Sequence, residues 1–130
     1  IQTISSDQEL KKYKIIIAED DDTSYYFLEL ALSDITERVV HAKDGIQVVD
    51  MAKKYTDTDI ILMDIKMPKL NGFEATKEIR KLNKDVFIIA QTAYAQNGFE
   101  TIVSEAGLNA YISKPIDKQK LIDIINNIKN

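Results

Sequence analysis

Short apolar runs alternate along the chain with longer stretches in which apolar residues recur at helical spacing. The apolar runs predict strands over residues 14–19, 38–42, 59–64, 86–91 and 110–113. The stretches between and after them predict helices over residues 23–35, 45–55, 73–83, about 97–106 and 117–129. Five strand–helix units in succession predict a single doubly wound α/β domain built on a parallel five-stranded sheet.

Residues 14–130 form this predicted domain, and the polar residues 1–13 are predicted to be a linker or tail with a weak helical fragment over residues 7–12. The chain begins at Ile1 rather than at methionine, so we expect it to be cut from a longer protein or processed.

Two of the predicted helices carry clear apolar stripes. The last helix follows Asp117, a favourable N-cap residue. Gly98 falls at or inside the start of the fourth helix, where glycine costs about 1 kcal/mol relative to alanine. We therefore expect the fourth helix to be short and the least stable. The stripe residues are Phe27, Leu28, Ala31, Leu32 and Ile35 in the first helix, and Leu121, Ile124, Ile125 and Ile128 in the last.

Charged residues stand directly after three of the apolar runs. Glu19, Asp20 and Asp21 follow or end the first run, Asp64 ends the third, and Lys114 follows the fifth. In an open α/β sheet the carboxyl ends of parallel strands open onto one crevice. We therefore expect carboxylates and one ammonium group to share a single pocket.

This pocket predicts a site for a divalent cation and a phosphoryl group. Two unit charges about 4 Å apart interact by about 4 kcal/mol at an effective dielectric near ~20, so Glu19, Asp20 and Asp64 repel one another strongly. A hard cation such as Mg²⁺ offsets that repulsion and shares its remaining positions with water and phosphate. Thr92 supplies a hydroxyl at the end of the fourth strand, and Asp64 is best placed to act as nucleophile and form an acyl phosphate.

Composition excludes several other classes of function. The chain has 130 residues, with 17 Lys+Arg against 21 Asp+Glu and a net charge of −4, so it lacks the basic surplus of a nucleic-acid binder. No apolar run reaches the roughly 20 residues that span a bilayer, and no signal peptide is visible, so we expect a cytoplasmic domain without membrane contact. Zero cysteines exclude thiol catalysis and disulfides.

Four motifs together resemble the CheY-like response-regulator receiver domain of two-component signalling. They occur in the family's order and spacing between about residues 14 and 128. The resemblance implies a flavodoxin-like (βα)₅ fold with strand order 2-1-3-4-5. The motifs are Ile17-Ala18-Glu19-Asp20-Asp21, Leu62-Met63-Asp64-Ile65-Lys66-Met67-Pro68 with Asn71-Gly72, Gln91-Thr92-Ala93, and Tyr111-Ile112-Ser113-Lys114-Pro115-Ile116.

The resemblance implies a role for each motif residue. Asp64 is the phosphoacceptor, and the phosphoryl donor is a phosphohistidine on a kinase or phosphotransfer module. The domain then catalyses its own phosphorylation and dephosphorylation and is no stand-alone metabolic enzyme. Asp20, Asp64 and the main-chain carbonyl of Lys66 bind Mg²⁺ directly, and Glu19 binds it through water. Lys114 neutralises the phosphoryl group and is joined to Pro115 by a cis peptide. Thr92 and an inward-rotating Tyr111 form the switch.

The resemblance also suggests the output and the context. The readout surface is the face made by the fourth helix, fifth strand and fifth helix, which also serves homodimers in this family. Lys66 and Tyr94 flank the path of the hydrolytic water, so we expect slow self-dephosphorylation. The motifs are most similar to receivers of hybrid sensor histidine kinases, which indicates a kinase as the parent chain.

Plainer interpretations exist for the same residues. Acids at strand ends are often solvated, Thr92 is also a suitable helix cap, and Tyr111 is also suitable for packing. Lys114 also suits a surface position, and His41, the single histidine, is interpreted as a strand-end residue and not as a phosphodonor. Two other functions stay open: a receiver-like interaction module without phosphorylation, and an aspartate-nucleophile phosphatase, which needs a second acid where this chain has Lys66.

Overall fold

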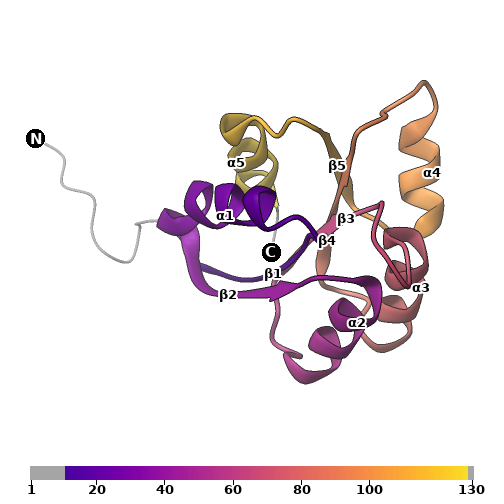
Figure 1. Ribbon diagram of the computed structural model, residues 1–130, viewed down its shortest axis with the longest axis horizontal. Coiled ribbons are helices and arrows are strands. Elements are labelled where there is room, and N and C mark those ends of the chain that lie inside the picture. Colours follow the sequence, from indigo (N-terminus) through magenta and orange to yellow (C-terminus); the bar gives the residue numbers. More distant parts are fainter. Residues whose placement is uncertain (1–10, 129–130) are drawn as a thin grey trace, which may run out of the picture.

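The computed structural model describes residues 11–128, which form a central parallel sheet with helices on both faces (Figure 1). Residues 1–10, which hold most of the predicted linker and of the weak helical fragment over residues 7–12, lie outside the described residues, and residues 11 and 12 belong to no helix. The elements are β1 (Tyr13–Ala18), α1 (Asp22–Ala31), the 3₁₀ turn η2 (Ser33–Ile35), β2 (Thr36–Ala42), α2 (Gly45–Lys54), β3 (Ile60–Asp64), α3 (Gly72–Leu82), β4 (Phe87–Thr92), α4 (Phe99–Ala106), β5 (Ala110–Ser113) and α5 (Lys118–Asn126).

The strands are parallel and lie in the order β2-β1-β3-β4-β5, which confirms the predicted topology. Their register aligns the carboxyl ends of the central strands. Ala18 at the end of β1 pairs with Met63 of β3, and Asp64 pairs with Gln91 of β4. Residues that follow β1 and end β3 therefore meet at one edge of the sheet.

Two apolar layers hold the helices against the sheet. All five residues of β3 are buried, and alternate side chains enter opposite layers, as expected for a strand covered on both faces. Ile61 and Met63 pack in the layer shared with α2, α3 and α4. Ile60 and Leu62 pack in the layer shared with α1 and α5. The central strands are thus fixed from both sides, which keeps their carboxyl ends in place.

The first helix is shorter than predicted. It ends at Ala31, and residues 33–35 form a 3₁₀ turn in place of the predicted continuation to residue 35. The Ser33 hydroxyl donates to the main-chain oxygen of Leu30 at 2.9 Å, a local bond that competes with helix extension. The main-chain nitrogen of Ile35 then donates to the oxygen of Leu32, which closes the tighter turn.

The stripe predicted on this helix is largely confirmed, with one error. Leu28, Ala31, Leu32 and Ile35 are buried, but Phe27 is 47% exposed. Successive helical residues point about 100° apart, so the burial of Leu28 against the sheet turns Phe27 toward solvent.

The predicted cost of Gly98 inside the fourth helix is wrong. Gly98 is the N-cap of α4 and adopts a left-handed conformation with φ of 85°, which glycine tolerates better than other residues. The helix proper starts at Phe99 and has eight residues, which confirms that it is short. Its low stability stays a prediction.

The remaining boundaries agree with the predictions to within a few residues. Asp117 is the N-cap of α5, as predicted, and its side chain accepts a hydrogen bond from the main-chain nitrogen of Gln119 at 2.8 Å. Strand β1 stops at Ala18, so Glu19 lies just after the strand and not in it. Among residues 11–128, no helix has the length and apolar character needed to cross a bilayer.

Candidate metal and phosphoryl site

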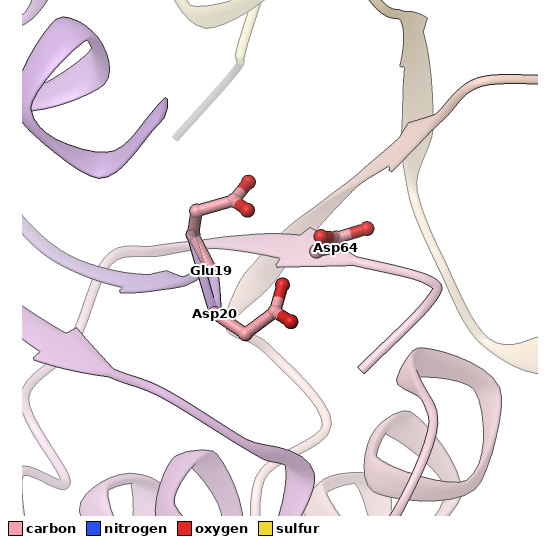
Figure 2. Close-up of side chains that lie close together, drawn as sticks. All are labelled: Glu19, Asp20 and Asp64. Carbon is pink, nitrogen blue, oxygen red and sulfur yellow. The ribbon is translucent and has the colours of Figure 1, made fainter. Parts of the chain in front are cut away.

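Three acidic side chains meet at the carboxyl edge of the sheet. Figure 2 shows Glu19 and Asp20 on the loop after β1 and Asp64 at the end of β3. One carboxylate oxygen from each residue lies within 4.8 Å of the other two. Glu19 and Asp64 are buried, at 1% and 3% exposure, whereas Asp20 is exposed. The predicted convergence of these acids is therefore found, with two of them buried side by side.

The backbone around these acids is held by short contacts. The main-chain nitrogen of Glu19 donates to the oxygen of Ala42 on β2 at 2.9 Å. Beyond β3, the nitrogen of Gly72 donates to the oxygen of Ile65 at 2.8 Å. A Cβ atom at Gly72 would lie 2.6 Å from the main-chain oxygen of Asp64, so a larger residue would push the loop away from the acid. The absence of a side chain at this position allows the loop to close beneath Asp64.

Lys114 reaches the same pocket from the end of β5. Its Nζ lies 3.1 Å from Oδ2 of Asp64 and 3.5 Å from Oε1 of Glu19. Its main-chain nitrogen donates to the oxygen of Thr92 at 2.8 Å, and the peptide between Lys114 and Pro115 is cis, as predicted. Burial lowers the pKa of Lys114, but its hydrogen bond and charge interaction with Asp64 outweigh this and raise that pKa. Lys114 is therefore a cation fixed between two buried carboxylates.

One ammonium group does not balance the three acids. Burial and then the charge of Asp64 raise the pKa of Glu19 despite the nearby Lys114. Within the described part of the chain, Oε1 of Glu19 accepts no hydrogen bond, and its contact with Nζ of Lys114 at 3.5 Å is an ion pair only. Clustered carboxylate oxygens, one of them buried without a hydrogen bond, match the oxygen ligands that Mg²⁺ takes. The residues present therefore fit the predicted ion.

Main-chain groups complete the surroundings of the acids. The main-chain nitrogen of Lys66 donates to Oδ1 of Asp64 at 3.1 Å, while the Lys66 side chain is exposed. An aspartate-nucleophile phosphatase would need a second acid two residues after Asp64, and this position brings none to the pocket. Asp21 has a separate role, because its side chain caps α1 by accepting from the nitrogen of Ser24 at 2.8 Å. That hydrogen bond lowers the pKa of Asp21.

Thr92 ends β4 next to the pocket but is bonded to the following loop. Its hydroxyl donates to the main-chain oxygen of Tyr94 at 3.2 Å and accepts from the nitrogen of Tyr94 at 3.1 Å. The Tyr94 side chain is 71% exposed. Thr92 thus connects the pocket edge to the segment that leads into α4.

Tyr111 on β5 is bonded to α4. Its hydroxyl donates to Oε2 of Glu100 at 3.1 Å, and this bond raises the pKa of Tyr111. Its ring packs edge-on against Phe99, with centroids 5.0 Å apart and planes at 79°. An inward rotation of Tyr111 would have to break both contacts.

Two polar residues near the site had no assigned role in the sequence interpretation. Gln91 is 1% exposed, and neither atom of its side-chain amide has a hydrogen-bond partner among the described residues. It lines a cleft of about 510 Å³ together with Phe27, Lys114 and Pro115. The signal was visible, since Gln91 is the one amide in an apolar strand. His41 bonds to the main-chain oxygen of Glu19, which its position at a strand end did not indicate.

Comparison with known protein families gives one match over most of the chain. The model described as "Response regulator receiver domain" matches residues 15–126. The chain is 35% identical over 121 residues to hybrid signal transduction histidine kinase I of Dictyostelium discoideum, covering 87% of this chain but only 7% of the kinase. It is 31% identical over 115 residues to chemotaxis protein CheY of Halobacterium salinarum, covering 88% of this chain and 95% of that protein.

Solved structures give the same result. The receiver domain of a sensor histidine kinase from Pseudomonas aeruginosa PAO1, solved with magnesium coordinated in its active site cleft, is 36% identical with a TM-score of 0.79, over 88% of this chain and 95% of that one. A receiver domain in complex with a histidine phosphotransfer protein of Saccharomyces cerevisiae is 27% identical with a TM-score of 0.83, over 91% and 89% of the two chains.

The raised pKa of Glu19 predicts a stability change that depends on pH and metal. The pKa of Glu19 is higher in the folded, metal-free domain than in the unfolded chain. The free energy of unfolding therefore falls as pH rises through the pKa of the folded domain, because ionised Glu19 is less stable in the folded state. Glu19→Gln should therefore stabilise the metal-free domain at about pH 7.5, and this gain should shrink toward about pH 5. Urea unfolding at both pH values measures it.

Mg²⁺ should make the wild type more stable than Glu19→Gln, the reverse of the order expected for their free energies of unfolding without metal. At 100 times its dissociation constant, Mg²⁺ should stabilise the wild type by about 2.7 kcal/mol, and at the same concentration it should stabilise Glu19→Gln less. The exposed acid Glu105 on α4 provides the control, because Glu105→Gln should change neither the pH dependence nor the response to Mg²⁺. An equal response of wild type and Glu19→Gln would contradict the assignment of Glu19 to the ion site.

Proposed function

Because the chain belongs to the response-regulator receiver domain family of two-component signalling, we propose that Asp64 accepts a phosphoryl group from a phosphohistidine of a partner protein or module. A carboxylate oxygen of Asp64 forms the new bond to phosphorus while the phosphorus–nitrogen bond breaks, and the leaving imidazole keeps the electron pair. The observation that carries the proposal is the contact of buried Asp64 with Lys114, next to the acidic pair on the loop after β1.

The surrounding residues have separate roles in this proposal. Asp20, Asp64 and the main-chain carbonyl of Lys66 would hold Mg²⁺ directly, and Glu19 would hold it through water. When bound, Mg²⁺ neutralises charge on the transferring phosphoryl group. Lys114 neutralises further phosphoryl oxygens, in keeping with a transition state that needs positioning more than covalent help.

Phosphorylation would be read through Thr92 and Tyr111. The phosphoryl group adds charge and acceptor oxygens at Asp64, and Thr92 would donate to one of them after leaving Tyr94. Tyr111 would then rotate inward and release Glu100. The surface changed in this way is the face of α4, β5 and α5, which we propose for output and for homodimer formation.

The surface for the phosphohistidine partner is proposed to be α1 with the neighbouring cleft. Tyr26, Phe27 and Leu30 on α1 are 63%, 47% and 74% exposed, an apolar group at the surface. Phe27 also lines the cleft that contains Lys114, so this apolar group continues to the reacting residues. A partner helix packed on it would bring its histidine toward Asp64.

The parent protein is proposed to be a hybrid sensor histidine kinase with this domain, over residues 14–130, in the cytoplasm. Two receivers of histidine kinases among the relatives, at 35% and 36% identity, support this context. In such a chain, residues 1–13 would link the receiver to the preceding kinase module.

Acetyl phosphate with Mg²⁺ should phosphorylate the wild-type domain and leave Asp64→Ala unlabelled, because the nucleophile is gone. Intact-mass spectrometry measures the label. Asp50→Ala, which removes an exposed aspartate of α2, should be labelled like the wild type. Labelling that persists in Asp64→Ala would falsify the assignment of the phosphoacceptor.

A change on α1 should slow phosphorylation by a protein donor and leave phosphorylation by acetyl phosphate unchanged. Leu30→Asp places a charge in the apolar group and should slow transfer from a phosphorylated histidine phosphotransfer domain by about tenfold or more, which corresponds to about 1.4 kcal/mol of the barrier. Labelling by acetyl phosphate should be unchanged, because a small donor needs no docking surface. Ile102→Asp on exposed α4 is the matched control, and equal slowing by both changes would argue against docking on α1.

Lys66 and Tyr94 should slow hydrolysis of the phosphorylated Asp64. Both side chains are exposed, and their main chains bond to Asp64 and Thr92, so a long cation and an aromatic ring start close enough to screen the attacking water. Lys66→Asn with Tyr94→Ala should shorten the half-life about threefold to tenfold, equal to about 0.7–1.4 kcal/mol of barrier. Loss of label over time after removal of acetyl phosphate measures this, and an unchanged half-life would refute the screening role.

A further inference from the structure

His41 connects strand β2 to the loop that carries the acidic pair. Its Nε2 lies 2.8 Å from the main-chain oxygen of Glu19. A carbonyl oxygen can only accept, so Nε2 of His41 carries the hydrogen and donates. The imidazole stacks face to face on the ring of Tyr25 in α1, with centroids 3.6 Å apart and planes at 6°. The donor is therefore held in place by a buried ring.

Tyr25 is itself fixed. Its side chain is 6% exposed, and its hydroxyl donates to Oε2 of Glu29 at 3.0 Å. Burial and this bond raise the pKa of Tyr25 to about 12, so the hydroxyl keeps its hydrogen at physiological pH. The ring beneath His41 is thus part of the packed structure of α1 and cannot easily turn away.

The carbonyl that His41 holds belongs to the peptide between Glu19 and Asp20. The nitrogen of Glu19 donates to the oxygen of Ala42, the residue that follows His41 in β2. Both main-chain groups of Glu19 are therefore bonded to the end of β2. Together these bonds set the direction in which the chain leaves Glu19 and hence the starting point of the exposed Asp20 side chain.

We infer that His41 is a positioning residue for the metal site, whose Nε2–H holds the Glu19–Asp20 peptide so that both carboxylates face the ion. This inference rests on the proposed function, because Mg²⁺ is the ligand that the two acids are held for. Residues behind the ligands commonly fix ligand orientation in this way, and their loss weakens metal binding. His41 itself touches neither the ion nor the phosphoryl group.

The test compares two substitutions of His41 by Mg²⁺ titration calorimetry. His41→Phe keeps an aromatic ring to stack on Tyr25 but removes the donor, and it should raise the Mg²⁺ dissociation constant about threefold to tenfold, the range expected for one hydrogen bond. His41→Gln retains an N–H group at similar reach and should stay within about twofold of the wild type.

A third variant controls for stability alone. Ile79→Val removes one methyl group from the fully buried Ile79 of α3, which is not among the residues assigned to the ion, so it should lower the free energy of unfolding and leave Mg²⁺ affinity unchanged. The inference is overturned if His41→Phe binds Mg²⁺ like the wild type. It is also overturned if His41→Gln or Ile79→Val weakens binding as much as His41→Phe.

Amide hydrogen exchange in the metal-free domain separates this inference from the proposed function. The Glu19 amide should exchange faster in His41→Phe than in the wild type or Ile79→Val, because the peptide next to it is released. If the Glu19 amide exchanges at the same rate in His41→Phe and in the wild type, the positioning role is overturned without any measurement on metal. If the wild type binds no Mg²⁺, the proposed function fails, and the exchange rates still decide whether His41 holds the loop.

Discussion

The parallel pairing of β1 with β3 is the contact on which the carboxyl edge of the sheet depends. Ala18 pairs with Met63, so the next residues of both strands, Glu19 and Asp64, lie side by side and buried. A shift of one residue would turn every side chain of a strand to the other face. Mutual repulsion of the acids is therefore imposed by the strand hydrogen bonds and the apolar layers. Lys114 offsets part of it through ion pairs with both buried acids, but one ammonium group does not neutralise three carboxylates.

Much of the fold and the site could be predicted from the sequence, because their determinants are local. Apolar runs that end in acids indicate both the strands and their carboxyl ends, and parallel strands bring those ends together without knowledge of any side-chain contact. The strand order came from the resemblance of four motifs. The convergence of Glu19, Asp20, Asp64 and Lys114 was predicted independently of that order, because the carboxyl ends of parallel strands open onto one crevice.

The features that the sequence did not indicate depend on contacts between elements. Phe27 fits the apolar stripe of α1, but the sheet covers the side of the helix that contains Leu28 and leaves Phe27 at the surface. Gly98 has a different backbone conformation from the helix it precedes, which a count of helical positions cannot reveal. His41 bonds to Glu19 only when β2 pairs with β1, and it stacks on Tyr25 only when α1 packs beside β2. Such roles arise from packing, and no pattern along one element contains them.

The two hydrogen bonds between Thr92 and Tyr94 have a consequence for how the domain encodes its state. A hydroxyl has a single hydrogen, and in this structure that hydrogen is given to the main-chain oxygen of Tyr94. It cannot also be given to a phosphoryl oxygen on Asp64. In the proposed phosphorylated domain the loop before α4 and the phosphoryl group would therefore compete for one hydrogen atom. Each molecule would then hold one partner or the other, and the fraction of molecules in each state would set the strength of the output.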